Sequence, residues 1–215
     1  MARKNLLISG LFAMLWYVAI NIFVPMQYSG YDIATQTISE LSAVHAPTRS
    51  LWVVLCIFYS LLFMAFGIGI LLTSNGDRKL RFVAGVIIMD AVIGIFWPPM
   101  HQRVVLAAGG GSLTDTLHIV WTFIHLVLVL LMIGFGAAAF GKAFRIFSFG
   151  IVLIFIVFGI LTANESPGLD AGLPTPYIGI WERINIGAYL VWIIVFAILL
   201  LIRDKTSIAT HANFV

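Results

Sequence analysis

Long, uninterrupted apolar runs restrict the fold of this chain more than any other feature. Six runs approach the roughly 20 residues that cross the hydrocarbon core of a bilayer. They cover about residues 6–26, 51–73, 82–100, 115–138, 146–163 and 183–202. Backbone groups in lipid find no water, so each segment must satisfy its own hydrogen bonds as a helix. The sequence therefore predicts an all-α integral membrane protein, a single transmembrane domain over residues 1–215 with a bundle of six transmembrane helices.

The composition excludes a soluble globular protein. Apolar residues make up 61% of the chain and charged residues 10%, whereas soluble domains have about a quarter of their residues charged. The formal net charge of +3 arises from basic residues concentrated in short loops, so we expect membrane lipids and no nucleic acid as partners. The run at 6–26 is long enough to span, so we interpret it as the first transmembrane helix and not as a cleaved signal peptide. The oligomeric state stays open.

The distribution of basic residues predicts the orientation. Six spans place both termini on one side, and nine of the twelve Lys and Arg residues accompany the termini or the second and fourth loops. The positive-inside rule assigns that side to the cytoplasm. We therefore expect a multi-pass protein of the cell membrane with cytoplasmic N- and C-termini. The outer loops are longer and more polar, so any chemistry should face outward.

Two ionisable residues are expected deep in the bilayer. With a rise of about 1.5 Å per residue, Asp90 lies roughly 13 Å below the outer end of the third span and His125 roughly 15 Å below that of the fourth. An unpaired charge at that depth costs at least about 2.5–3.5 kcal/mol, so we expect the two side chains to face the bundle interior and either to pair or to share a water molecule. The pair would be a catalytic acid–base couple or proton relay, or else a hydrogen bond that only fixes helix packing.

A second polar group is predicted nearer the outer surface. Asp115 and His118 lie one turn apart on the fourth span, close to His101 at the end of the third, and are further candidates for catalysis. Zinc, if present, would be bound by His118 or Asp115 together with ligands from other helices such as His101 or His45. No HExxH-like spacing supports such a site, so the cofactor stays open. Asp115 has a structural alternative, a favourable charge at a helix N-terminus.

The first outer loop contains TQTISELSAV (residues 35–44), in which polar and apolar positions alternate. This pattern predicts a short interfacial helix or a re-entrant lid. Ser39, Glu40 and Ser42 would then face the polar cavity. A solvated loop is the alternative.

Charged residues of the outer side are the candidates for substrate binding: Glu40, Arg103, Glu182 and Arg183. The two arginines suit a phosphate group, because guanidinium binds it with two parallel hydrogen bonds. The adjacent pair at the start of the last span could instead form a salt bridge or contact lipid headgroups.

Three motifs carry a resemblance to a known family: YDIATQTISEL (31–41), DTLH (115–118) and GIWERINIGAYLVW (179–192). With these, nearly the whole chain resembles the bacterial and archaeal membrane family catalogued as "domain of unknown function 998". The resemblance implies a six-helix protein of a prokaryotic inner or plasma membrane, with no established activity. A distant similarity to the eukaryotic family that includes the lipid-anchor remodelling protein Frag1 would favour lipid-linked substrates.

A weaker likeness is to the intramembrane hydrolases of the alkaline ceramidase and progestin-receptor superfamily. These hold zinc with three histidines beside a serine and an aspartate in a helical bundle. The likeness extends to Asp90, His118 and His125, but the chain lacks the seven-span plan and the late histidine pair. That departure weakens the case for a catalytic zinc.

Three functions remain after this reading. The leading hypothesis is an enzyme or binding protein for a lipid or lipid-linked substrate at the outer leaflet. Asp90 and His125 would supply acid–base chemistry, with Asp115, His118 and Glu40 lining the entrance. A small proton-coupled transporter is the second, but it requires a polar path on the cytoplasmic side of Asp90, where the spans are almost wholly apolar and no paired broken helices appear. The third is a structural or accessory membrane protein without catalysis.

Overall fold

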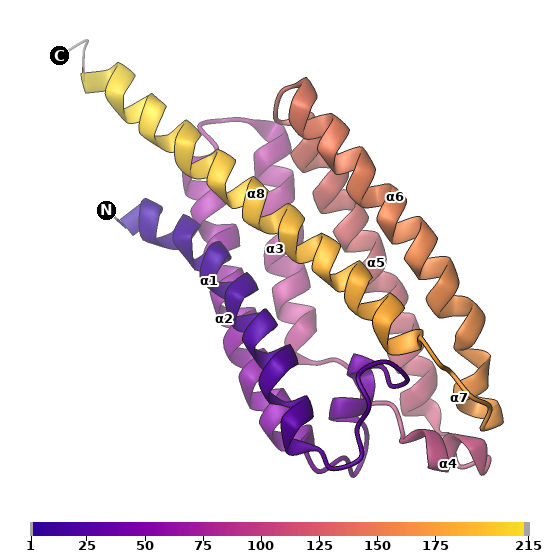
Figure 1. Ribbon diagram of the computed structural model, residues 1–215. Coiled ribbons are helices and arrows are strands. Elements are labelled where there is room, and N and C mark those ends of the chain that lie inside the picture. The colour runs from indigo at the N-terminus through magenta and orange to yellow at the C-terminus, as the bar shows by residue number, and fades with distance from the viewer. Residues whose placement is uncertain (1, 213–215) are drawn as a thin grey trace.

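Helices form nearly the whole of the computed structural model, which describes residues 2–212 (Figure 1). The long helices are α1 (Ala2–Phe23), α2 (Arg49–Thr73), α3 (Arg78–Ile95), α5 (Leu113–Ala138), α6 (Lys142–Glu165) and α8 (Ile178–Ala212). The short ones are the 3-10 helices η1 (Pro25–Gln27) and η2 (Ile38–Ser42) and the α-helices α4 (Arg103–Ala107) and α7 (Pro167–Ala171). The predicted all-α fold is confirmed.

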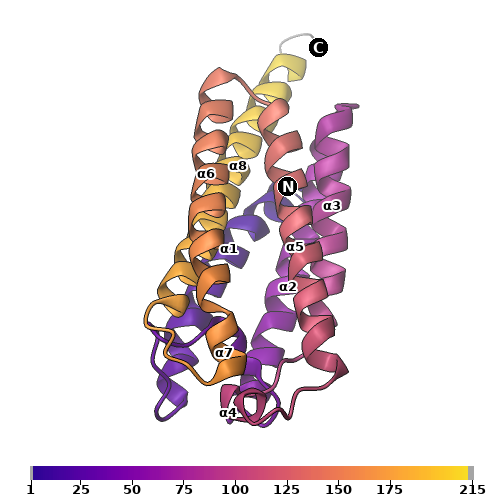
Figure 2. The ribbon, with the colours of Figure 1, turned by 90° about the vertical axis from the view of Figure 1, so that its right-hand side faces the viewer.

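The long helices close into a ring. Neighbours around the ring pack in the order α1, α2, α3, α5, α6, α8 and back to α1, and α5 also contacts α8 across it. The N- and C-terminal ends of the chain lie at the same end of the bundle, here called the terminal end, and α4 and α7 lie at the opposite, loop end (Figure 1). Figure 2 shows α5 and α6 separating from their turn at the terminal end toward the loop end. The two helices are therefore farther apart at the loop end than at the terminal end.

Five helical segments of the described chain are long and apolar enough to cross a membrane. They are α1 with η1, α2, α5, α6 with α7, and α8. The remaining long helix, α3, has only 18 residues and carries Arg78, Lys79, Arg81 and Asp90. The structure thus supports a membrane-embedded bundle, whereas a membrane crossing by α3 and the orientation of the termini stay predictions.

The third helix also differs from its expected bounds of 82–100. It begins at Arg78 because Asp77 caps it, accepting hydrogen bonds from the N–H groups of Lys79 and Leu80. It ends at Ile95, ahead of Pro98 and Pro99. A proline disfavours the helical conformation in the residue before it, so the segment that follows is extended and supplies free carbonyls to the site.

Aromatic residues fill the terminal half of the ring. Phe63, Phe66, Trp192 and Phe196 are fully buried, and the Trp192 and Phe196 rings stack at 4.9 Å. A methyl group added to Gly136 would lie 2.6 Å from the Trp192 ring, so only glycine lets α5 approach α8 this closely. Side chains therefore pack closely in the interior of the terminal half of the bundle.

A folded loop closes the other half of the ring. The chain between η1 and α2 packs Ile38 and Leu41 of η2 onto Ile20, Val24 and Trp52. It is also tied to the segment after α3, since the Val44 N–H donates to the Met100 carbonyl at 2.8 Å. The predicted short helix in TQTISELSAV is thus present, as a 3-10 helix that covers the bundle.

Candidate functional site

A cavity of about 450 Å³ lies between this loop and the aromatic interior. All six long helices and η2 contribute to its lining, which is mostly apolar. Polar side chains also line it: Ser39, Ser42, Ser60, Asp90, His118, Thr122, His125, Thr162, Ser166, Glu182 and Asn185. Such a volume, with apolar walls and a minority of polar groups, is typical of small-molecule and cofactor sites.

The deepest polar contact in the cavity joins Asp90 to His125. The His125 Nδ1 atom lies 2.7 Å from Asp90 Oδ1, and the exposed fractions of the two side chains are 35% and 4%. Trp121 stacks on the imidazole with the rings 2° apart in orientation, and Tyr189 meets it edge-on. The predicted pairing is therefore confirmed. Because Asp90 accepts the Nδ1 proton, a neutral His125 carries its lone pair on Nε2 and can act as a base.

A second histidine lies nearer the loop end. His118 Nδ1 is 2.7 Å from the Pro98 carbonyl oxygen, and Nε2 is 3.1 Å from Ser39 Oγ. Both Ser39 and His118 line the cavity, as the sequence predicted. Their direct contact was not predicted. They are 79 residues apart, and no local spacing links a loop serine to a helix histidine.

Asp115 has a structural position at the start of α5. It accepts the backbone N–H groups of His101 at 2.6 Å and Ser112 at 2.8 Å, and its Oδ2 atom lies 2.8 Å from His101 Nδ1. The carboxylate thus completes a capping box with Ser112. Asp115 thus lies at a helix N-terminus, as its structural alternative predicted, and the structure adds that its carboxylate caps the helix.

The residues proposed for zinc do not gather into one site. Within the described part of the chain, no three His, Cys, Asp or Glu side chains are placed to hold a common metal ion. Asp115 pairs with His101, whereas the His118 ring contacts Pro98 and Ser39. We therefore derive no step through a metal.

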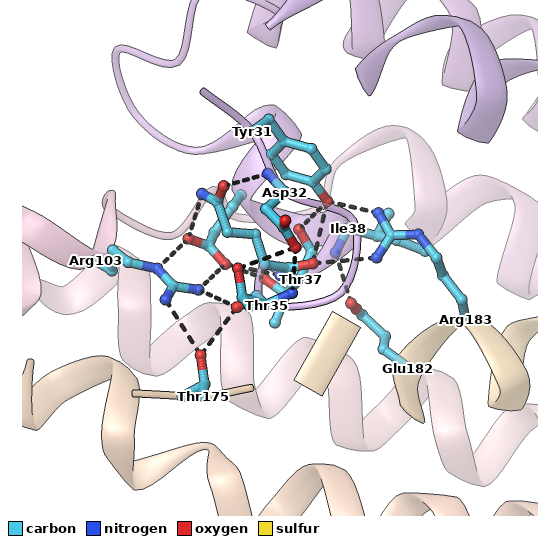
Figure 3. Close-up of polar contacts among 11 residues, drawn as sticks. Tyr31, Asp32, Thr35, Thr37, Ile38, Arg103, Thr175, Glu182 and Arg183 are labelled. Atoms are coloured by element: carbon cyan, nitrogen blue, oxygen red, sulfur yellow. Dashed lines mark hydrogen bonds and ion pairs between the residues drawn. The ribbon is translucent and has the colours of Figure 1, made fainter. Parts of the chain in front are cut away.

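The carboxylate of Glu40 pairs with Arg103, and Figure 3 shows the guanidinium of Arg103 with its hydrogen bonds. Arg103 Nε donates to Glu40 Oε1 at 2.6 Å and Nη2 donates to Oε2 at 2.8 Å. The same guanidinium reaches the Thr35 carbonyl and the Thr175 hydroxyl. Hydrogen bonding to Glu40 raises the pKa of Arg103 above its ordinary value. This pair joins the first loop to α4 and to the segment before α8.

Glu182 and Arg183 hold the other side of the same loop. Neighbouring residues on a helix point in different directions, and these two bind different groups (Figure 3). Glu182 accepts the Ile38 N–H at 2.6 Å. Arg183 donates to the Tyr31 hydroxyl at 2.6 Å and to the carbonyls of Ile33 and Gln36. All four candidate substrate-binding residues thus anchor the loop of residues 28–48, which we call the lid. A role of these residues in binding substrate stays a prediction.

One cavity residue was missed as a site residue. The side-chain amide oxygen of Asn185 (Oδ1) is buried and has no hydrogen-bond partner among the described residues, although Asn185 lines the cavity. A buried acceptor without a donor is costly, so a water molecule or a ligand is expected there. The signal was visible in the sequence, because Asn185 shares one face of α8 with Glu182 and Tyr189 at helical spacing.

The family model described as "Protein of unknown function (DUF998)" matches residues 11–199. The chain belongs to the DUF998 family. The matched range contains every residue that lines the cavity, from Tyr17 to Leu190. No curated protein and no solved structure matches the chain. The function of this DUF998 protein must therefore be argued from the cavity itself.

Proposed function

We propose that this DUF998 protein binds a lipid or lipid-linked substrate that enters the cavity sideways, between α5 and α6. The observation that supports the entry route is the exposure of lining residues on both helices. Thr122 and Leu126 of α5 and Ala163 of α6 line the cavity and are exposed. Since α5 and α6 diverge toward the loop end (Figure 2), this seam connects the cavity with the surrounding lipid.

The chemistry of the lining fits an amphipathic molecule. Trp52, Trp97 and Trp121 supply broad apolar surfaces, and indole rings favour ligands with both apolar and polar parts. The unpartnered Asn185 oxygen offers an acceptor to a hydroxyl or amide of the substrate. A headgroup would occupy the cavity while an acyl or prenyl chain leaves through the seam.

The Asp90–His125 pair would supply the acid–base chemistry. Asp90 orients the imidazole through Nδ1, which leaves Nε2 to take or give a proton in the cavity. The positive-inside distribution of charges supports an orientation with the loop end, and hence the cavity, toward the outer leaflet. The substrate would accordingly be an outer-leaflet lipid or a lipid-linked precursor.

The transporter alternative is less favoured by the packing. A proton path from Asp90 to the terminal end would have to pass Phe63, Phe66 and Phe196, which are fully buried. In that region the Trp192 indole N–H donates to the Ser148 hydroxyl at 2.8 Å. A cavity open on one side suits binding or catalysis better than transport.

Crosslinking tests the lateral entry. A phospholipid with a diazirine in its acyl chain is added to the protein in nanodiscs, and the labelled peptides are mapped by mass spectrometry. Ala163→Trp narrows the seam, so labelling of the α5 lining should fall about tenfold, which corresponds to about 1.4 kcal/mol of binding. Ile160→Trp is the matched control, because Ile160 is 57% exposed on α6 but lies outside the lining. Equal labelling in both variants would contradict the proposed entry.

Lipid analysis tests the chemistry. The wild-type protein and the variants Asp90→Asn and His125→Gln are incubated with a total lipid extract, and the products are compared by mass spectrometry. Conversion by the wild type that disappears in both variants, while crosslinking is retained, supports the acid–base role. Conversion that survives both variants refutes it.

A further inference from the structure

We infer that Ser39 and His118 form a nucleophile–base pair in this cavity, and that the substrate carries a carboxylic ester. This inference rests on the proposed function only in that the substrate reaches Ser39 through the lipid-accessible cavity. It assigns chemistry to a contact that the Asp90–His125 pair does not use, since the two histidines lie seven residues apart on α5, about 10 Å along the helix axis.

The hydrogen bonds fix which atom carries which proton. The Pro98 carbonyl can only accept, so His118 Nδ1, at 2.7 Å, must carry a proton. In the neutral imidazole the lone pair is then on Nε2. Ser39 Oγ lies 3.1 Å from Nε2, so the hydroxyl donates its proton there. This is the arrangement of an activated serine: nucleophile, base, and a third group that orients the base.

Each member of the pair is held by other contacts. His118 lies on α5, where Thr122 donates to its backbone carbonyl at 2.9 Å. The Pro98 segment is held by the Thr114 hydroxyl, which donates to the Pro99 carbonyl at 2.7 Å. Ser39 lies between Ile38, whose N–H binds Glu182, and Glu40, which binds Arg103. The anchored lid therefore places the hydroxyl, as a preorganised site requires.

The expected reaction is transfer of an acyl group to Ser39 and then to water. Ser39 Oγ attacks the ester carbonyl carbon while its proton moves to His118 Nε2. The carbon–oxygen bond to the alcohol breaks, and the alcohol leaves with that proton. Water then attacks the acyl-serine, giving one proton to His118, and the carboxylic acid departs as Ser39 regains its proton. Ester and water become acid and alcohol, with no change of oxidation state.

An alkyl fluorophosphonate tests the pair directly. It reports an activated serine, because the Oγ–phosphorus bond forms as fluoride leaves. The protein in detergent is treated with a long-chain probe, and the adduct is counted by intact mass and located by peptide mapping. The wild type should carry one adduct, on Ser39. Ser39→Ala should carry none, and His118→Gln should react about 100-fold more slowly or worse, the size of a lost general base.

Ser50→Ala is the matched control. Ser50 is exposed in the first turn of α2 and lies outside the cavity lining. It should react within about threefold of the wild type, and thermal unfolding should show that all variants remain folded. Absence of an adduct on Ser39 in folded wild type, or an equal rate in His118→Gln, overturns the inference. Lipid crosslinking that persists in that case leaves the binding proposal standing, so the two failures are distinguishable.

Discussion

Arg103→Ala should loosen the lid over the cavity. Arg103 donates two charged hydrogen bonds to Glu40 and a third to the Thr35 carbonyl. The Glu40 side chain is 4% exposed, against 28% for Arg103. Truncation therefore leaves a buried carboxylate without its counter-ion and detaches the loop from α4.

The size of the effect follows from these contacts. Removing one partner of a buried ion pair costs about 3–5 kcal/mol. Glu40 keeps the Thr37 N–H, the Thr37 hydroxyl and the Gln36 amide as donors, and Arg103 is partly solvated, so we take the lower limit of about 3 kcal/mol. Because about 1.4 kcal/mol corresponds to a factor of ten, the local opening equilibrium should rise about 100-fold.

Hydrogen–deuterium exchange measures this opening. The amides of Thr37 and Ile38 are bonded to the Glu40 and Glu182 carboxylates, so they exchange when the lid opens. A peptide over residues 33–42 should exchange about 100-fold faster in Arg103→Ala, whereas peptides from the middle of α2 should be unchanged. Arg103→Lys should lie between, because lysine keeps the charge but not the two-pronged geometry.

Unchanged exchange in Arg103→Ala, within about threefold, would refute this reasoning. The lid would then be held without Arg103, and the arginine would be free to bind an anionic substrate, as the sequence alone suggested. If Arg103 instead binds the phosphate of a lipid, adding that lipid to the wild-type protein should change the exchange of the lid amides. The same measurement thus separates an anchor from a ligand-binding arginine.

Packing and pH give two further predictions. Gly136→Ala should lower the stability in detergent by about 1–3 kcal/mol, since its methyl group would overlap the Trp192 ring. Gly134→Ala, with nothing within 4 Å of the added carbon, should be neutral or stabilising, so equal melting temperatures would contradict the packing. The Asp32 carboxylate accepts hydrogen bonds from the N–H groups of Thr35 and Ala34, and these bonds lower its pKa below the ordinary 3.8. The stability that the ionised carboxylate gives its turn should be complete above about pH 4 and lost as the pH falls through the lowered pKa. A carboxyl NMR titration that returned 3.8 or more would count against that cap.

Depth and helical phase made the floor of the site predictable. Asp90 and His125 could be matched because each lies a known number of residues from a helix end, and the rise per residue is constant. Ser39 and Ser42 line the cavity as predicted, whereas Glu40, which was expected to face it with them, lies outside the lining and pairs with Arg103. The successful inferences use only local geometry. The family, too, was recognisable from short local motifs, and its model match confirms it.

The hydrogen-bond partners of the long side chains at the loop end could not be predicted from the sequence. Arg103 and Arg183 have long side chains that suit a phosphate, a lipid headgroup or a backbone carbonyl equally well. Only the folding of residues 28–48 over the bundle decides that they bind this loop. The same is true of His118, whose ring meets Pro98 and Ser39 because α3 ends early and the lid returns to it.

The sequence by itself determined a membrane-embedded helical bundle, the matching level of Asp90 and His125 on neighbouring helices and the polar character of one end. Those properties depend on apolar length and helical period, which every segment carries alone. The tertiary structure decided the ring order, the seam between α5 and α6, and the pairing of Ser39 with His118. Those depend on hydrogen bonds and packing between segments far apart in the chain, where no local pattern specifies the partner.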